Sequence, residues 1–251
     1  MSAVAPSSTT IGSSQQHTAY KGQSGEHRGL GVFAFRPEGA VVVNLESKDP
    51  ANYTVKVGVQ SLPDNSSELL ITNIVIHENF NNHMSDDIAL IKLKYPVTWS
   101  PLVQPICLPT NNFKPTIDTM CWVIGWGQEK TKEASKTPYN VQGLAVRIVN
   151  NEICNHRYQF LLAKNQKKFI GRDMLCTSSE WGLDTCQDTS GSSLVCQMNK
   201  TWVQMGVVSW NVGCGRRQFP SIFTSTSHFT QWIKRQIKMV STTRSYSSKR
   251  M

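Results

Sequence analysis

Short runs rich in β-branched residues, separated by turn signals, occupy most of the chain from Ala40 onward. Runs of about four to eight such residues are typical of strands, and several of them at this spacing favour a barrel or a sandwich. The sequence therefore predicts an all-β domain over residues 40–240. The main runs are 41–45, 53–59, 68–76, 88–93, 121–127, 144–149 and 202–208.

The two ends of the chain differ from this β-rich region. Residues 1–39 are rich in Ser, Thr, Gly and Gln and lack sustained periodicity, apart from one apolar run at 31–35, so we expect a largely disordered arm. Apolar residues at three- and four-residue intervals over 229–240 predict one amphipathic helix, with Ser227 as its cap. The polar, basic residues 241–251 predict a frayed tail.

The net charge of +9 is concentrated near the C-terminus, because residues 190–251 hold nine Lys/Arg and no acid. A local positive potential attracts polyanions such as heparin, anionic lipid or nucleic acid. The alternative interpretation is a solvated face with a loose basic tail. Since no nucleic-acid-binding motif of a recognised kind is present, only a weak affinity for polyanions is expected.

The seven cysteines all lie between residues 107 and 214, and none has the spacing of a zinc site. The pattern predicts disulfides and neither a metal nor a cofactor. Disulfides favour a secreted protein, whereas the opening residues lack the apolar core of a secretory signal peptide, so the compartment stays open.

No apolar run approaches the roughly 18 residues that cross a bilayer. Candidate N-glycosylation sites, usable only in the secretory route, are Asn52, Asn65 and Asn199.

The stretch that carries chemistry is Asp184-Thr-Cys-Gln-Asp-Thr-Ser-Gly-Ser-Ser-Leu-Val-Cys196. It places Ser190 on a tight turn between two cysteines, which is how a hydrolase presents a nucleophile. The chain resembles the trypsin/chymotrypsin-like serine proteases over about residues 44–240, and within that family it is most similar to testis-type and tryptase-like members. The other motifs that carry the resemblance, in family order, are Asp87-Ile-Ala-Leu-Ile-Lys-Leu93, Pro105-Ile-Cys-Leu-Pro109, Cys121-Trp-Val-Ile-Gly-Trp-Gly127, Val208-Ser-Trp-Asn-Val-Gly-Cys214 and Trp232-Ile233.

The resemblance implies a chymotrypsin-like double β-barrel that ends in a helix. Because residues 1–39 match nothing in the family, we expect the first barrel to be incomplete, with exposed strand edges. The implied disulfides are Cys121–Cys196, Cys154–Cys176 and Cys186–Cys214, which leaves Cys107 without a partner.

In the family mechanism a serine attacks the scissile carbonyl, a histidine takes its proton and a buried aspartate orients the histidine. Ser190 and Asp87 match the serine and the aspartate. The histidine belongs in a Thr-Ala-Ala-His-Cys run, but the corresponding residues, 41–45, read Val-Val-Val-Asn-Leu. His77 follows a predicted strand and matches a strand-end histidine of the family, so we interpret it as structural.

Four residues of the serine loop also depart from the family pattern: Asp188, Thr189, Ser192 and Ser193. Thr189 stands where the family has an aspartate that receives a newly cut N-terminus, and Asp188 stands where a glycine contributes to the oxyanion hole. A carboxylate beside a developing oxyanion opposes it, and loss of one oxyanion donor alone costs about 10²–10³ in rate.

The resemblance also implies a vestigial substrate pocket. Asp184 matches the acid at the base of trypsin-like pockets, while Asn211 and Ser221 replace two glycines and narrow the slot. Ser209 and Trp210 match the strand along which a substrate backbone lies, so an extended peptide could still be captured.

These residues favour a catalytically inactive serine protease homologue that binds an unidentified protein or peptide. Two alternatives stay open. One is a trypsin-like endopeptidase specific for Lys and Arg, and the other is a polyanion-binding module built on the basic C-terminal segment.

Overall fold

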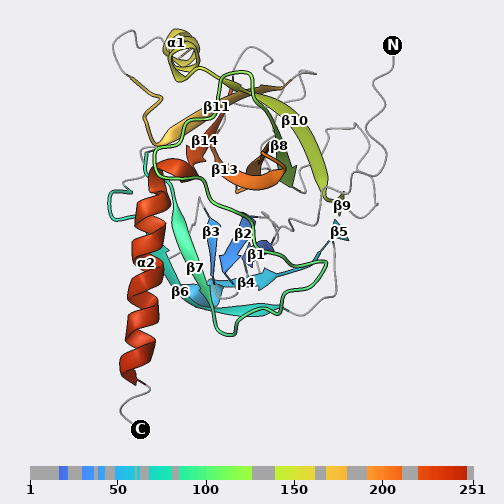
Figure 1. Cartoon of the computed structure of the whole chain (residues 1–251), viewed down its shortest axis with the longest axis vertical. Helices are drawn as coiled ribbons and strands as arrows, with labels where there is room; N and C mark the ends of the chain where they lie inside the picture. The colour runs from blue at the N-terminus through green and yellow to red at the C-terminus, as the bar shows by residue number, and fades with distance from the viewer. Residues whose placement is uncertain are drawn as a thin grey trace.

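The computed structural model of the chain describes residues 17–21, 30–36, 39–42, 49–59, 61–62, 68–80, 85–125, 139–161, 168–179, 191–210 and 220–247. Two closed barrels of antiparallel strands lie one above the other, and a long helix runs from the second barrel down the side of the first (Figure 1). The predicted double β-barrel with a C-terminal helix is confirmed.

The first barrel is closed by its earliest strand. β1 pairs with β2 on one side, where His17 lies opposite Val32, and with β4 on the other, where Lys21 lies opposite Tyr53. The strands around this barrel, in order, are β1 (His17–Lys21), β2 (Leu30–Arg36), β3 (Gly39–Val42), β7 (Ala89–Leu93), β6 (Leu69–Ile76) and β4 (Tyr53–Lys56).

This closure corrects two predictions. The expected incomplete first barrel with open edges is wrong, because a full circuit of strands leaves no edge. The expected disorder of residues 1–39 is wrong for 17–21 and 30–36, which form β1 and β2. The apolar run at 31–35, the one signal in this region, lies in β2. Strand pairing with β3 and β4 supplies the backbone partners that local composition did not reveal.

β7 is buried on both of its faces. Ala89, Ile91 and Leu93 point into the first barrel beside Tyr53 and Val55. The alternate residues Ile88 and Leu90 pack instead against the long helix α2 and the second barrel, in a cluster with Val207, Phe229, Trp232 and Ile233. This explains why the sequence here is almost continuously apolar rather than alternating.

The second barrel is built around the Cys121–Cys196 disulfide. The two cysteines lie directly opposite each other on β8 and β12, and both are fully buried among Val123, Leu194 and Phe223. The strands around this barrel, in order, are β10 (Gln142–Val149), β11 (Met174–Ser179), β14 (Ser221–Ser225), β13 (Thr201–Trp210), β12 (Ser193–Met198) and β8 (Met120–Gly125).

A second disulfide, Cys154–Cys176, joins the helix α1 (Asn151–Leu161) to β11. Both of these predicted pairs are confirmed. Cys107 is unpaired and exposed, as predicted. Cys186 and Cys214 lie outside the described residues, so their pairing stays a prediction.

The two helices differ from expectation. α1 was not predicted, although Asn150 caps it by accepting a hydrogen bond from the Glu152 amide at 2.6 Å. α2 spans Thr226–Ser247 and so includes part of the predicted frayed tail 241–251. Ser227 lies within the first turn of α2 rather than before it, which corrects its assignment as a cap.

The remaining elements are short. They are a 3₁₀ turn, η1 (Pro50–Asn52), and a two-stranded sheet of β5 (Ser61–Leu62) with β9 (Tyr139–Asn140). Among the helices in the described part of the chain, none combines the length and the apolar character that crossing a bilayer requires.

A glycine substitution tests the close approach of β13 to β14. A Cβ at Gly206 would lie 3.0 Å from both the Cβ of Phe223 and the carbonyl oxygen of Thr224. Gly206→Ala should therefore destabilise the protein by about 1–3 kcal/mol through overpacking. The matched control is Gly143→Ala in β10, where the nearest atom, Cδ1 of Trp122, lies 4.0 Å away. Urea unfolding of the two variants should separate them, and equal stabilities would contradict this packing.

Candidate functional site

Asp87 lies two residues before β7, at the junction of the two barrels. Its side chain is 5% exposed. Ser209 of β13 donates its hydroxyl proton to Oδ2 of Asp87 at 2.5 Å, and Thr224 of β14 donates to the backbone carbonyl of Asp87 at 2.9 Å. A buried carboxylate needs such charge-assisted partners, so these bonds hold the start of β7 against the second barrel.

The neighbouring residue Asp86 forms the turn that leads into Asp87. Its φ of 54° lies in the left-handed region, which Asp tolerates better than most residues. The Asp86 amide donates to Oδ2 of Asp173 at 3.0 Å, and the Asp86 carbonyl accepts from the Ile88 amide at 2.9 Å. Burial, and secondarily the nearby Asp173 carboxylate, raise the pKa of Asp86.

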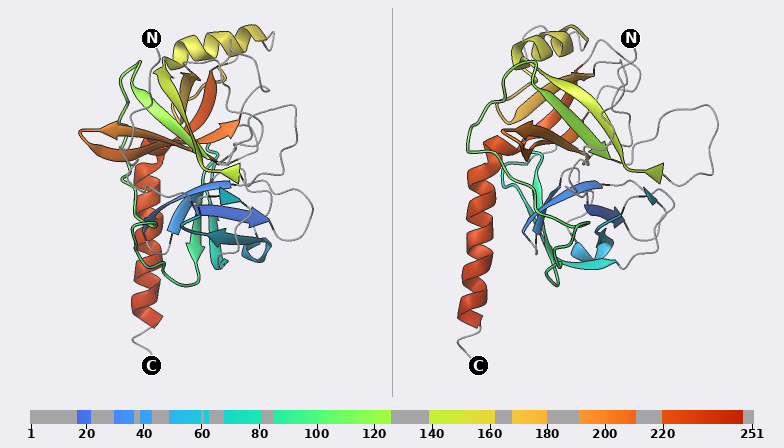
Figure 2. Two further views of the ribbon diagram at one scale, coloured as in Figure 1. Left: turned by 90° about the vertical axis from the view of Figure 1, so that its right-hand side faces the viewer. Right: turned by 45° about the vertical axis from the view of Figure 1, so that its right-hand side comes forward.

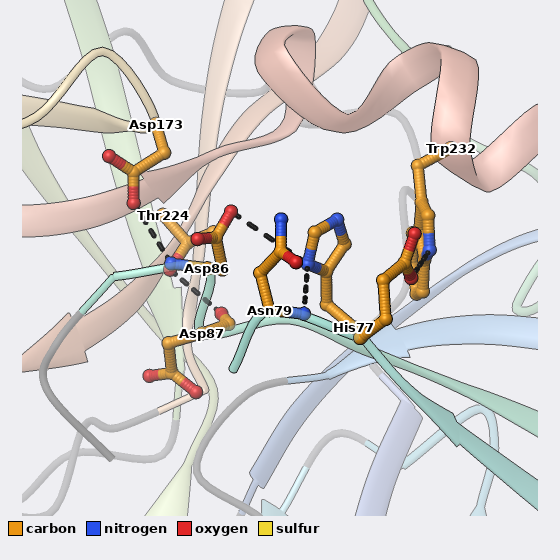
Figure 3. Close-up of polar contacts among 8 residues, drawn as sticks. His77, Asn79, Asp86, Asp87, Asp173, Thr224 and Trp232 are labelled. Atoms are coloured by element: carbon orange, nitrogen blue, oxygen red, sulfur yellow. Dashed lines mark hydrogen bonds and ion pairs between the residues drawn. The ribbon is translucent and has the colours of Figure 1, made fainter. Parts of the chain in front are cut away.

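His77 packs against α2 rather than facing Asp87. Its ring lies 5.0 Å from the rings of both Phe229 and Trp232. Nδ1 of His77 accepts a hydrogen bond from the Asn79 amide at 3.3 Å, and the nearest carboxylate oxygen belongs to Asp86 at 3.7 Å. Figure 3 shows the Asp87 carboxylate pointing away from the imidazole. This geometry agrees with the structural interpretation of His77.

The other described histidines lie elsewhere in the fold. His17 begins β1, His156 is on the exposed side of α1, and His228 lies edge to face against Phe229 in the first turn of α2. His27 and His83 lie outside the described residues.

The strand register brings the end of β3 close to Asp87. Val42, the last residue of β3, pairs with Ala89, two residues beyond Asp87. Residues 43–48 read Val-Asn-Leu-Glu-Ser-Lys, with no histidine, and lie outside the described residues.

The structure describes only part of the predicted site. It brings Ser209 to Asp87, and it places Trp210 at the end of β13 and Ser221 at the start of β14. Ser190, Asp184 and Asn211 lie outside the described residues, as does the candidate glycosylation site Asn65. The other two candidate glycosylation sites, Asn52 and Asn199, are exposed.

The described residues that follow Ser190 begin at Gly191, where a hydrogen bond fixes the backbone. Gly191 has a φ of 85°, and its amide donates to the Val208 carbonyl at 2.9 Å. Ser192 and Ser193 are both buried, and Ser193 Oγ accepts from Gln204 Nε2 at 3.1 Å. The two serines therefore replace their family counterparts inside the protein rather than on its surface.

Sequence reasoning missed Thr224 and Asp173 as parts of this site, and it gave Ser209 only a substrate-binding role. No local signal could have found the hydrogen-bond partners of Asp87, because Ser209 and Thr224 are 122 and 137 residues from it in sequence. Within the described segments, no cluster of three or more His, Cys, Asp or Glu side chains could hold a metal ion.

Comparison with known proteins agrees with this architecture, in which a buried aspartate lies between two barrels. The sequence model of the trypsin family matches residues 41–233. The chain belongs to the trypsin family. It is similar to human testisin, with 38% identity over 195 residues that cover 74% of this chain and 61% of testisin. It thus spans about three fifths of that relative's length.

The family match and the first barrel begin at different residues. The match begins at residue 41, whereas β1, β2 and the first half of β3 precede it. The first barrel of this trypsin-family chain is therefore completed by strands that the family pattern does not cover.

The raised pKa of Asp86 predicts a pH-dependent stability. Because the pKa in the folded protein lies above the ordinary value of 3.8, ionisation of Asp86 destabilises the fold as pH rises through that interval. Asp86→Asn, which tolerates the same backbone conformation, should raise the melting temperature at neutral pH. The gain should shrink as pH falls through the raised pKa and vanish below the ordinary value of 3.8.

Thermal unfolding across pH, followed by circular dichroism, would test this. Asp118→Asn is the control, since Asp118 also has a positive φ, of 69°, but lies on an exposed turn. A gain from Asp86→Asn that did not vary with pH would show that burial of its charge is not the cause.

Proposed function

We propose that this trypsin-family chain is catalytically inactive and acts by binding a protein or peptide. The observation that carries the proposal is the environment of Asp87. The aspartate that would orient a catalytic histidine is retained, buried and bonded to Ser209, whereas residues 41–45, which correspond to the family's histidine run, contain no histidine. In this arrangement Asp87 ties the two barrels together.

The chemistry of the missing group supports the same conclusion. Without a base, the hydroxyl of Ser190 keeps its proton and is a poor nucleophile. Removing the histidine from a serine protease triad lowers kcat on the order of 10⁶-fold. The carboxylate of Asp188 beside the oxyanion position and the uncharged Thr189 would each reduce what remains.

The binding role rests on the end of β13. β12 pairs with β13 as far as Val207, opposite Ser193, and Val208 is still bonded through its amide and carbonyl to Ser192 and Gly191, so within the described residues Ser209 and Trp210 extend past this pairing. A strand that outruns its neighbour is where an extended peptide adds by backbone hydrogen bonding. The vestigial pocket residues Asp184, Asn211 and Ser221 would then set which side chain is accepted.

Active-site labelling tests the inactivity directly. The protein should not react with a fluorophosphonate probe, and its hydrolysis of Lys and Arg ester or amide substrates should be at least about 10⁴-fold below that of trypsin assayed in parallel. Ser190→Ala should leave any background unchanged. Labelling or Lys/Arg-directed cleavage that disappeared in Ser190→Ala would instead establish the alternative, a trypsin-like endopeptidase.

A second candidate function is polyanion binding through α2. Lys234, Arg235 and Lys238 are exposed on this helix, on the side opposite the buried Trp232 and Ile233. Three cations on one helical face concentrate positive potential where a sulfated polysaccharide can bind.

Heparin chromatography tests this second candidate. The Lys234→Gln/Lys238→Gln variant should elute at a lower salt concentration than the unmodified protein, because each lost cation removes a screened attraction. Lys200→Gln, an exposed cation in the turn between β12 and β13, is the control. Equal retention of all three proteins, or elution with neutral proteins, would argue against an α2 site.

A further inference from the structure

The helix α1 lies across the far end of the second barrel, away from the first barrel (Figures 1 and 2). Its inner face is fixed to the protein. Cys154 is bonded to Cys176, and Tyr158 donates its hydroxyl proton to the Pro220 carbonyl at 2.5 Å. Both residues are almost fully buried, so the orientation of the helix on the barrel is set.

The outer face of α1 carries an apolar ridge. Ile153 and Phe160 are seven residues apart, which places them on the same side of a helix, opposite Cys154 and Tyr158. Ile153 is 53% exposed and Phe160 is 83% exposed. The exposed side chains of His156 and Arg157 lie on either side of the ridge. Together these four side chains form a surface that is apolar along its middle and polar at its sides.

Exposed cations lie on α1 and on the segment that follows it. In the described part of this region they are Arg157, Lys168 and Arg172, and Glu152 is an exposed acid at the start of the helix. Beyond the helix the chain returns to it, because Oδ1 of Asn155 accepts hydrogen bonds from the amides of Phe169 and Ile170 at 2.7 and 3.1 Å. This return brings the exposed Lys168 next to α1, and the exposed Arg172 follows shortly after.

We infer that the α1 ridge, defined by Ile153, His156, Arg157 and Phe160, docks on the surface of an anionic lipid membrane. Apolar side chains flanked by cations are the pattern by which a helix lies in the interface of a bilayer, with the apolar residues among the acyl chains and the cations at the head groups. A helix of 11 residues is too short to cross a bilayer, so the contact is peripheral.

Two features favour lipid over a polyanionic polysaccharide at this site. A sulfated chain would engage the cations but would leave Phe160 in water, whereas a bilayer covers both. The helix α1 also stands at one end of the molecule, where it can meet a flat partner (Figure 2). Docking here leaves the junction around Asp87 uncovered, and the inference does not depend on whether the chain is an enzyme.

Vesicle co-sedimentation of the whole chain tests the inference. The protein should bind phosphatidylcholine vesicles that contain phosphatidylserine, bind pure phosphatidylcholine vesicles much less, and be released by high salt. Phe160→Ser should weaken binding about tenfold, since it removes the largest apolar contribution, and Lys168→Gln should weaken it about fivefold.

A matched pair of variants separates the ridge from general apolar adhesion. Ile153→Ser should weaken binding, whereas Leu70→Ser, at a residue of β6 in the first barrel that is 54% exposed, should not. Circular dichroism of each variant confirms that it is folded. The inference is overturned if the protein ignores anionic vesicles at low salt, if Leu70→Ser and Ile153→Ser weaken binding equally, or if Phe160→Ser binds as the unmodified protein does.

Discussion

The two-sided burial of β7 is the constraint on which the rest of this structure depends. One face of the strand fills the first barrel, and the other face meets α2 and the second barrel. A single five-residue strand therefore packs against the interior of the first barrel, against α2 and against the second barrel at once. Asp87 stands at its entrance because the strand must begin where the barrels meet, and the hydrogen bonds from Ser209 and Thr224 hold that end in place. These packing demands on the start of β7 do not depend on whether the chain catalyses a reaction.

Much of this arrangement could be predicted from the sequence, because its signals are local. The apolar run of β7 and the apolar stripe of α2 are readable from residue spacing alone. The family motifs predicted the partners of Cys121 and Cys154 because the pairing is a property of the barrel that the motifs specify.

The elements that sequence reasoning missed lack such signals. β1 and β2 lie in a Gly- and Ser-rich segment, and their stability comes from pairing with β3 and β4, which no local pattern records. α1 was missed because its apolar residues do not form one stripe. Cys154 and Tyr158 face inward while Ile153 and Phe160 face outward, so the helical periodicity is weak. The contacts of Asp87 join residues more than a hundred positions apart, and only the folded chain brings them together.

The Cys154–Cys176 disulfide does more than link α1 to a strand. An isolated helix of 11 residues is marginal in water, since so few hydrogen bonds hardly offset the cost of nucleation. α1 is helical because the barrel holds it through this bond and through the Tyr158 contact. Reduction of one covalent bond would therefore loosen a surface that lies at the end of the molecule while leaving both barrels closed, so the shape of that end depends on the redox state of its surroundings.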